Sequence, residues 1–210
     1  MFLDELPEFN QSALESLRVP LEDRKVSISR LNTTITYPCE FMLIASMNPC
    51  PCGYYGSQEK KCCCKPEQIK KYVNRISGPL LDRIDIQIEV NQIKYHQLEQ
   101  KGKTETSKKI RKRVNQAREI QLKRYQEYYI FSNSELTPKL IEKYCKLDTK
   151  SKQILEKAFD RLGLSGRAYN RILKVARTIA DLDACEEIQK KHLAEAIQYR
   201  SLDRKYWHNK

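Results

Sequence analysis

The sequence predicts two consecutive parts, an α/β domain at residues 1–91 and an all-α domain at residues 105–210. A continuous apolar run at Phe41–Ala45 is typical of a strand buried on both faces of a parallel sheet. Polar and apolar residues alternate over 26–37, which predicts a β-hairpin. Beyond Asn91 this alternation stops, and apolar residues recur at the spacing of amphipathic helices.

Within the α/β part, residues 8–19 carry apolar side chains at helical spacing, and Pro20 is expected to end that helix. A cysteine-rich loop at 50–64 follows the buried strand. A helix is expected over 66–76, with a proline in its first turn. Ile and Val alternate with acidic and amide residues over 84–90, which predicts a further strand.

The helical part is expected to begin after a linker at 92–104, where glutamine, lysine and a glycine gather. One helical stripe is formed by Ile110, Val114, Ala117, Gln121, Tyr125 and Tyr128. Further helices are expected over 151–162 and 189–199. The clearest amphipathic pattern is that of Ile172, Val175, Ala176 and Ile179.

The charge balance is strongly basic. The 210 residues include 39 Lys and Arg against 27 Asp and Glu, a formal net charge of +12. This excess favours a polyanionic partner such as nucleic acid, although a basic surface can also lack any specific partner. No run of about 18 apolar residues occurs, and the acidic N-terminus is unlike a signal peptide. We therefore expect a cytoplasmic protein with no membrane partner.

Two adjacent acids, Asp4 and Glu5, follow a short apolar segment. Acids at the carboxyl end of a parallel strand face the crevice where α/β folds bind ligands. One carboxylate can hold Mg²⁺ through water and the other can orient an attacking water, the Walker B arrangement of ATPases. The alternative is an ordinary acidic helix N-cap. Asn48, beyond the buried strand, could meet a phosphate or water beside these acids, although asparagine before proline is also common in turns.

The cysteine-rich loop contains two C-x-C steps. Cys50, Cys52, Cys62 and Cys64 supply four thiolates, the set that a tetrahedral structural Zn²⁺ site uses. Cys63 is not needed for such a site. The alternative is a group of free buried thiols.

Two arginines lie at element ends that suit phosphate contacts. Arg83 could reach a phosphate on a neighbouring subunit, or it could pair with Asp82 or Asp85. Arg167 lies in the first turn of a helix that Ser165 is expected to cap. The helix macrodipole disfavours a cation there unless an anion binds at the same helix end.

Further basic residues gather on two segments. Lys25 and Arg30 lie on the expected hairpin. Near the start of the helical part, only Glu119 opposes a run of Lys108, Lys109, Arg111, Lys112, Arg113, Arg118, Lys123 and Arg124. Such a stripe could contact the phosphates of nucleic acid, and the alternative is a solvated helix face.

Several segments together resemble the magnesium-chelatase-like AAA+ ATPases of the ComM/YifB type. They are FLDELPEF, PLEDRKVSISR, FMLIASMNPCPCGYYG, RISGPLLDRIDIQIEV and GRAYNRILKVARTIADLD. The match runs in order along most of the chain, and NPCPCG and SGPLLDRID are its most specific parts. The resemblance implies a P-loop-type AAA+ α/β core followed by a helical lid.

The resemblance also implies a function. Family members are ATP-dependent ring motors, expected to be hexamers, that act on DNA in branch migration during recombination and natural transformation. Asp4 and Glu5 are then the Walker B acids, with Asp4 at the Mg²⁺ of ATP. Asn48 is sensor 1, Arg83 the arginine finger acting in trans, and Arg167 sensor 2. The hairpin resembles the pre-sensor 1 hairpin, which faces DNA in related helicases.

The sequence departs from the family in one respect: it contains no G-x-x-x-x-G-K-[ST] phosphate loop, which normally precedes the Walker B acids. We therefore expect a C-terminal part of such a protein, with a truncated core. We expect it to be inactive alone, although its parent protein is an ATPase. One alternative is a non-catalytic, Zn-stabilised DNA- or protein-binding module. Another is the ATPase subunit of a magnesium chelatase, although the cysteine loop resembles the ComM-like branch.

Overall fold

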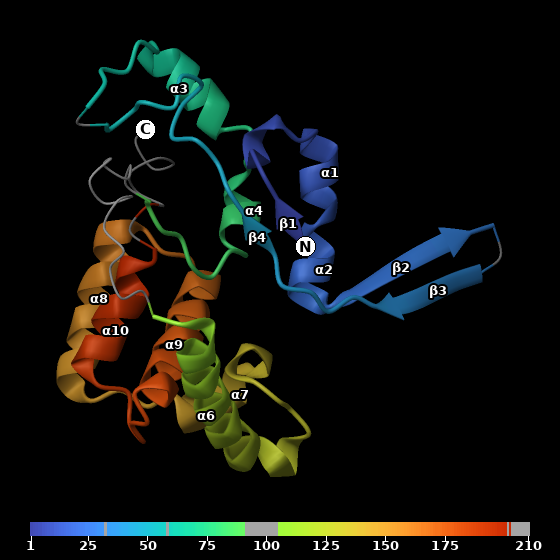
Figure 1. Cartoon of the computed structure of the whole chain (residues 1–210). Coiled ribbons are helices and arrows are strands. Elements are labelled where there is room, and N and C mark those ends of the chain that lie inside the picture. Colours follow the sequence, from blue (N-terminus) through green and yellow to red (C-terminus); the bar gives the residue numbers. More distant parts are fainter. Residues whose placement is uncertain (32, 58, 91–104, 201, 203–210) are drawn as a thin grey trace. The chain divides into compact units, whose positions relative to one another are not determined.

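The computed structural model describes residues 1–31, 33–57, 59–90, 105–200 and 202, which form two units (Figure 1). Unit 1 comprises Met1–Ile84 and unit 2 comprises Asp85–Leu202. The predicted linker at 92–104 lies outside the described residues. Among the described residues, no helix is both long and apolar enough to cross a membrane.

Two short parallel strands organise unit 1. Strand β1 (Phe2–Leu3) pairs with β4 (Ile44–Ala45), with Phe2 opposite Ile44 and Leu3 opposite Ala45. The apolar run at Phe41–Ala45 therefore contains a strand, but only its last two residues are paired. Its predicted burial on both faces is wrong, because Ile44 is 55% exposed in this chain.

The predicted helix at 8–19 is divided into short pieces. They are the 3-10 turn η1 (Leu6–Glu8), α1 (Gln11–Ser16) and α2 (Arg18–Asp23). Pro20 does not end the helical segment, as the sequence predicted. It is the third residue of α2, where a missing backbone N–H removes no hydrogen bond within the helix.

The predicted hairpin is confirmed. It is formed by β2 (Lys25–Arg30) and β3 (Thr33–Pro38), which are antiparallel. Hydroxyl pairs across the strands, such as Ser27 with Thr36 at 2.9 Å, reinforce the register on one face. Apart from a half-buried Val26, the described residues of both strands are exposed, and the hairpin projects from the rest of unit 1 (Figure 1).

A small apolar core holds the remainder of unit 1 together. It consists of Leu6, Leu14, Ile76, Leu80 and Leu81, most of which come from η1, α1 and the short helix α4 at Gly78–Leu81. Helix α3 (Pro66–Val73) begins as predicted and is shorter at its C-terminal end. Helix α4 (Gly78–Leu81) is capped by the Ser77 side chain, which accepts from the Leu80 N–H at 3.3 Å.

The strand predicted at 84–90 is wrong, since the structure has no regular element there. Ile86, Ile88 and Val90 are all at least half exposed. A backbone hydrogen bond from Gln87 N to Tyr199 O, at 3.0 Å, links this segment to the residue after α10 (Lys190–Gln198). Alternation alone did not produce a strand, because a strand also needs a neighbour to pair with.

Unit 2 is helical, as predicted. Its five longer helices are α6 (Ser107–Tyr125), α7 (Pro138–Tyr144), α8 (Thr149–Leu162), α9 (Gly166–Leu182) and α10 (Lys190–Gln198). Helix α9 lies at the centre and contacts α6, α7 and α10. Its buried stripe includes Ile172, Leu173, Ala176 and Ala180, close to the predicted amphipathic pattern.

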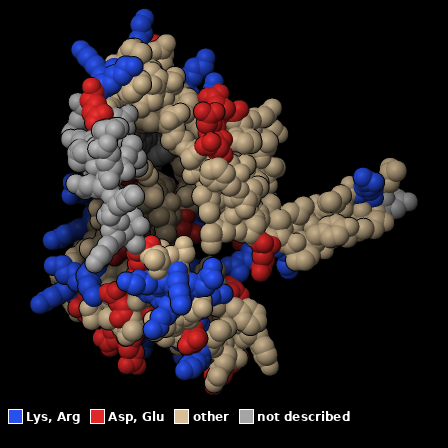
Figure 2. Space-filling model, viewed as in Figure 1, with Lys and Arg blue, Asp and Glu red and all other residues tan. Residues whose placement is uncertain are grey.

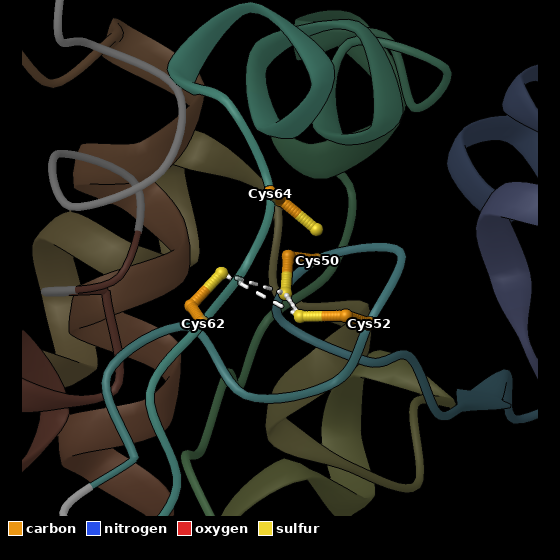
Figure 3. Close-up of side chains that lie close together, drawn as sticks. All are labelled: Cys50, Cys52, Cys62 and Cys64. Carbon is orange, nitrogen blue, oxygen red and sulfur yellow. Dashed lines mark hydrogen bonds between the residues drawn. The ribbon is translucent and has the colours of Figure 1, made fainter.

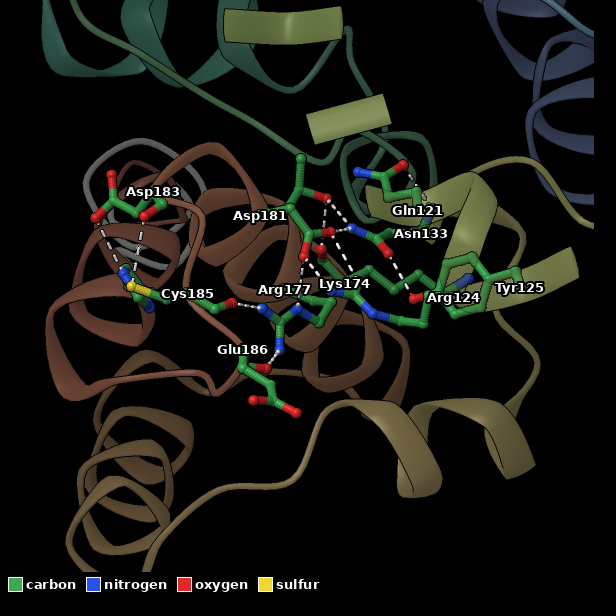
Figure 4. A network of polar contacts seen from close by, with 12 residues as sticks. Gln121, Arg124, Tyr125, Asn133, Lys174, Arg177, Asp181, Asp183, Cys185 and Glu186 are labelled. Atoms are coloured by element: carbon green, nitrogen blue, oxygen red, sulfur yellow. Dashed lines mark hydrogen bonds and ion pairs between the residues drawn. The ribbon is translucent and has the colours of Figure 1, made fainter. Parts of the chain in front are cut away.

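A buried polar network crosses this helical core (Figure 4). Arg124 of α6 donates twice to the Asp181 carboxylate, at 2.9 and 2.6 Å, and Arg177 donates to it at 3.2 Å. Asn133 donates to Asp181 at 2.8 Å and accepts from the Tyr125 hydroxyl at 2.7 Å. Assigning Arg124 to the exposed basic stripe was therefore wrong. Burial opposes its charge, but hydrogen bonds to Asp181 and Tyr125 and the negative charge of Asp181 together outweigh burial and raise the pKa of Arg124.

Replacing Asp181 tests how far unit 2 depends on this network. We expect Asp181→Asn to lower the free energy of unfolding by about 3–5 kcal/mol, because the buried guanidinium of Arg177 and the partly buried one of Arg124 are left without their counter-charge. The measurement is urea denaturation followed by circular dichroism. Asp183→Asn is the control, since the Asp183–Lys191 pair is exposed and is expected to contribute at most about 1 kcal/mol. Equal destabilisation in the two variants would contradict the assignment.

Candidate functional site

The two N-terminal acids lie where β1 ends. The Asp4 Oδ1 atom accepts a hydrogen bond from the Ser46 hydroxyl and another from the Glu5 N–H at 3.1 Å. Ser46 directly follows β4, so this contact joins the carboxyl ends of the two parallel strands. Both acids are exposed. The arrangement presents two carboxylates at the strand edge where α/β folds bind ligands.

Glu5 adopts an unusual backbone conformation. Its φ of 53° and ψ of 50° are left-handed, a region that costs a non-glycine residue roughly 1–2 kcal/mol. Glu5 is the N-cap residue of η1, as the alternative interpretation of the acids anticipated, but its side chain makes no capping hydrogen bond. Its carboxylate is therefore not used to begin that helical turn. Backbone strain at such a position is typical of functional sites.

Asn48 lies shortly beyond β4 and is exposed. Its backbone is hydrogen-bonded to the hydroxyl of Tyr72, a buried residue of α3. Burial raises the pKa of Tyr72, and the Asn48 contact partly opposes that rise. The Tyr72 contact therefore anchors the backbone of the segment that leaves β4 and carries Asn48.

Arg83 is buried and bound within unit 1. Its guanidinium pairs with Glu22 of α2 and donates to two backbone carbonyls, Arg18 O at 3.0 Å and Pro79 O at 2.6 Å. The sequence suggested Asp82 or Asp85 as alternative partners. Asp85 instead pairs with Arg171 of unit 2. Arg83 thus ties α2 to α4 in this chain.

Arg167 is an exposed residue in the first turn of α9, in unit 2. The prediction that Ser165 caps this helix is confirmed, because its hydroxyl accepts from the Ala168 N–H at 3.2 Å. The hairpin residues Lys25 and Arg30 lie at the two ends of β2, both exposed. On α6, Arg113 pairs with Glu105 at 2.9 Å.

The structure thus brings Asp4, Glu5 and the Asn48 segment to one strand edge and places Arg83 in a separate ion pair. Sequence reasoning missed the residues that these side chains contact: Ser46 beside Asp4, Tyr72 beside Asn48 and Glu22 beside Arg83. Ser46 had a signal, since it is the first polar residue after an apolar strand. Tyr72 and Glu22 had none, because their contacts depend on how distant helices pack.

The predicted cysteine cluster forms (Figure 3). The Sγ atoms of Cys50, Cys52, Cys62 and Cys64 all lie within 4.8 Å of one another. The Cys50–Cys52, Cys52–Cys62 and Cys50–Cys62 separations are 3.4, 3.5 and 3.7 Å. Four sulfurs that each lie about 2.3 Å from a tetrahedral ion are about 3.8 Å apart, so the cluster fits a closed thiolate site. Cys63 is exposed and takes no part.

The electrostatics of the loop also suit a metal ion. Hydrogen bonds from the backbone of Tyr54 and Cys63 lower the pKa of Cys52 to about 5. Burial and the neighbouring thiols raise the pKa of Cys64 to about 12. The cluster therefore holds a thiolate at neutral pH without an ion, and a divalent cation would allow the other thiols to ionise.

A second group, Asp183, Cys185 and His192, also places possible ligand atoms close together. The His192 Nδ1 atom accepts the Gln189 N–H at 3.0 Å, which leaves the proton on Nε2. That Nε2–H then donates to Asp183 at 3.1 Å. Both ring nitrogens are thus used in hydrogen bonds, so this group is a helix-end contact and not a ligand set.

A mixed α/β unit with paired acids at a parallel strand edge, joined in sequence to a helical unit, is the arrangement that the resemblance to AAA+ ATPases implies. Comparison with family models gives the particular family. The model described as magnesium chelatase, subunit ChlI, matches residues 1–98, and that of its C-terminal region matches residues 104–200. The chain belongs to the magnesium-chelatase-like AAA+ family.

Individual relatives agree with this assignment. Competence protein ComM of Haemophilus influenzae is 47% identical over 97% of this chain. The uncharacterized protein YifB of Salmonella typhimurium is 44% identical, and that of Escherichia coli is 43% identical, each over 97% of the chain. The chain spans 39% of the length of each of these relatives.

The buried contacts of Arg83 lead to a stability prediction. We expect Arg83→Ala to lower the free energy of unfolding of unit 1 by roughly 2 kcal/mol, because Glu22 and two carbonyls are left without a charged donor. Arg83→Lys should recover little of it, since an ammonium cannot reproduce the planar fork. Thermal unfolding of the two variants, compared with exposed Arg30→Ala, is the measurement. An Arg83→Ala variant as stable as Arg30→Ala would show that these contacts are dispensable.

Proposed function

We propose that this chain supplies the water-activating and nucleotide-sensing residues of an ATP-dependent AAA+ ring motor that acts on DNA. The observation that carries the proposal is the parallel pairing of β1 with β4. It places Asp4 and Glu5 at the same strand edge as Ser46 and the segment that leads to Asn48. Hydrolysis of a nucleoside triphosphate uses a carboxylate that holds Mg²⁺ and a polar side chain that positions the attacking water, and these side chains are of those types.

The residues have separate roles in this proposal. Asp4 uses Oδ1 for its hydrogen bonds to Ser46 and Glu5, so Oδ2 can accept from a water of hydrated Mg²⁺. When bound, Mg²⁺ neutralises charge on the phosphates of ATP. Glu5, with its carboxylate not used in capping, orients the attacking water. Asn48 contacts that water or the terminal phosphate.

The arginine assignments remain part of the proposal. Arg83, acting on a neighbouring subunit of a hexameric ring, would exchange its contact with Glu22 for a phosphate of that subunit. Arg167, at the exposed N-terminal turn of α9, combines a guanidinium with the amides of a helix N-terminus, which together suit an anion. The DNA assignment is supported by the net charge of +12 and by similarity to a protein named for competence.

Glu5→Gln tests the hydrolytic role. In a longer protein that contains this chain together with a phosphate-binding loop, we expect the variant to bind ATP with a near-normal Kd while its turnover falls at least about 100-fold, since the amide cannot act as a base. Phosphate release and equilibrium nucleotide titration are the measurements. Glu8→Gln, an exposed acid in the same turn of chain, is the control and should keep its turnover. Normal turnover in Glu5→Gln would refute the role of Glu5.

A second function, a Zn-stabilised binding module without catalysis, is favoured by the geometry of the cysteine cluster. Four thiolates on one loop are typical of structural Zn²⁺ sites. Because structural zinc contributes directly to folding, the ion would hold its four cysteine ligands in their observed positions. Binding of ATP by this chain at micromolar concentration would argue against a purely non-catalytic role.

Metal analysis tests the zinc assignment. We expect about one zinc per chain in the purified protein, and loss of that zinc in Cys64→Ser together with a fall in thermal stability. Cys63→Ser is the matched control, because Cys63 is adjacent to Cys64 in the sequence but its own thiol is exposed and lies outside the cluster. Zinc loss in both variants, or zinc in neither the wild type nor the control, would rule out the four-thiolate site.

A further inference from the structure

The N-terminal part of α6 is unusual in its exposure. Every residue from Glu105 to Gln116 is exposed, whereas Ala117, Gln121 and Tyr125 further along the helix are buried against unit 2. The helix is therefore anchored through its C-terminal half, and its first turns are exposed to solvent. We name residues 107–116 the free segment of α6.

Four cations dominate the free segment: Lys108, Lys109, Arg111 and Lys112. They line a shallow hollow together with Asn115, Gln116 and Glu119. Arg113 is not counted, because it pairs with Glu105. Figure 2 shows Lys and Arg side chains gathered over this end of α6. Arg118 and Lys123 of the predicted stripe are exposed further along the helix, outside this hollow.

These cations are unfavourable for the helix itself. The first turn contains no acidic residue, and the positive end of the helix macrodipole repels nearby cations. Like charges one turn apart, such as Lys108 and Lys112, add a further repulsion of a few tenths of a kcal/mol. A bound polyanion would reverse both effects, because its phosphates would face the cations and the positive helix end together.

We propose that the free segment of α6 enters the major groove of duplex DNA and contacts the phosphates through Lys108, Lys109, Arg111 and Lys112. The major groove is about 12 Å wide and admits an α-helix, provided that the helix is not covered by its own protein. Asn115 and Gln116 lie on the same hollow and have the amide groups that hydrogen-bond to adenine edges.

The hairpin is a weaker candidate for this contact. Its strands carry only Lys25 and Arg30, at opposite ends of β2, so it offers fewer phosphate contacts than the free segment. Duplex RNA is also a poor fit, because its deep, narrow major groove does not admit side chains. The proposal deepens the DNA part of the proposed function, on which it rests, and it requires no nucleotide hydrolysis.

The test is the salt dependence of DNA binding by the 210-residue chain. The probe is a fluorescein-labelled 20-base-pair DNA duplex, followed by anisotropy between 50 and 200 mM KCl. We expect the quadruple variant K108Q/K109Q/R111Q/K112Q to bind at least about tenfold more weakly at 100 mM salt. The slope of log K against log salt should become shallower by up to about 3.6, or about 0.9 for each phosphate that the variant no longer neutralises.

A matched control removes the same charge elsewhere in unit 2. The variant K146Q/K150Q/K152Q/K157Q changes four exposed lysines in and before α8. It should keep the wild-type slope within about 0.5. Glutamine has a helix propensity close to that of lysine and arginine, so both variants are expected to fold, which circular dichroism checks.

Three outcomes would overturn the proposal: equal weakening in the two quadruple variants, an unchanged slope in the α6 variant, or no binding by the wild type. Equal binding of a 20-base-pair RNA duplex would overturn the major-groove placement. As a second measurement, N115A/Q116A should weaken binding to duplex DNA at an unchanged salt slope. The Glu5→Gln turnover assay reports on hydrolysis separately, so failure of the α6 contact and failure of the ATPase assignment are distinguishable.

Discussion

The pairing of β1 with β4 is the constraint on which the candidate site depends. Backbone hydrogen bonds at its ends extend this pairing: Ile44 N to Met1 O and Ser46 N to Leu3 O, both at 3.0 Å, and Leu6 N to Ser46 O at 2.9 Å. Because the strands are parallel, both segments leave the pair at the same edge. Asp4 therefore meets Ser46, and the left-handed turn at Glu5 directs Leu6 into the core of unit 1.

The segment from Asn48 through the cysteine loop to α3 is closed by a contact between its two ends. The chain passes from Asn48 to the buried Cys50, around the loop to Cys64, and into α3. Tyr72 of α3 then returns to the Asn48 backbone. An ion bound by the four sulfurs would fix both ends of the cysteine loop, because metal binding and folding are coupled where the ligands lie on one loop. A metal centre at this place would thus stabilise the residue proposed to sense nucleotide.

The basic residues of this chain perform two different physical tasks. Arg83 and Arg177 are buried and Arg124 is partly buried, and all three donate to carboxylates or carbonyls, so their charge holds helices together. The lysines of the free segment of α6 are exposed and make the helix end less stable. Net charge counts both groups equally. Burial and partners separate the cations that support the fold from those available to a polyanion.

Features that depend on neighbouring residues could be predicted from the sequence. Alternation over 26–37 predicted the hairpin, Ser165 the start of α9, and the two C-x-C steps the sulfur cluster. Tertiary packing, in contrast, determines which distant groups meet: Glu22 with Arg83, and Asp181 with Arg124. It also determines that 84–90 forms no strand. The physical reason is that periodicity and capping are local, whereas a strand partner or a buried counter-charge is supplied by another part of the chain.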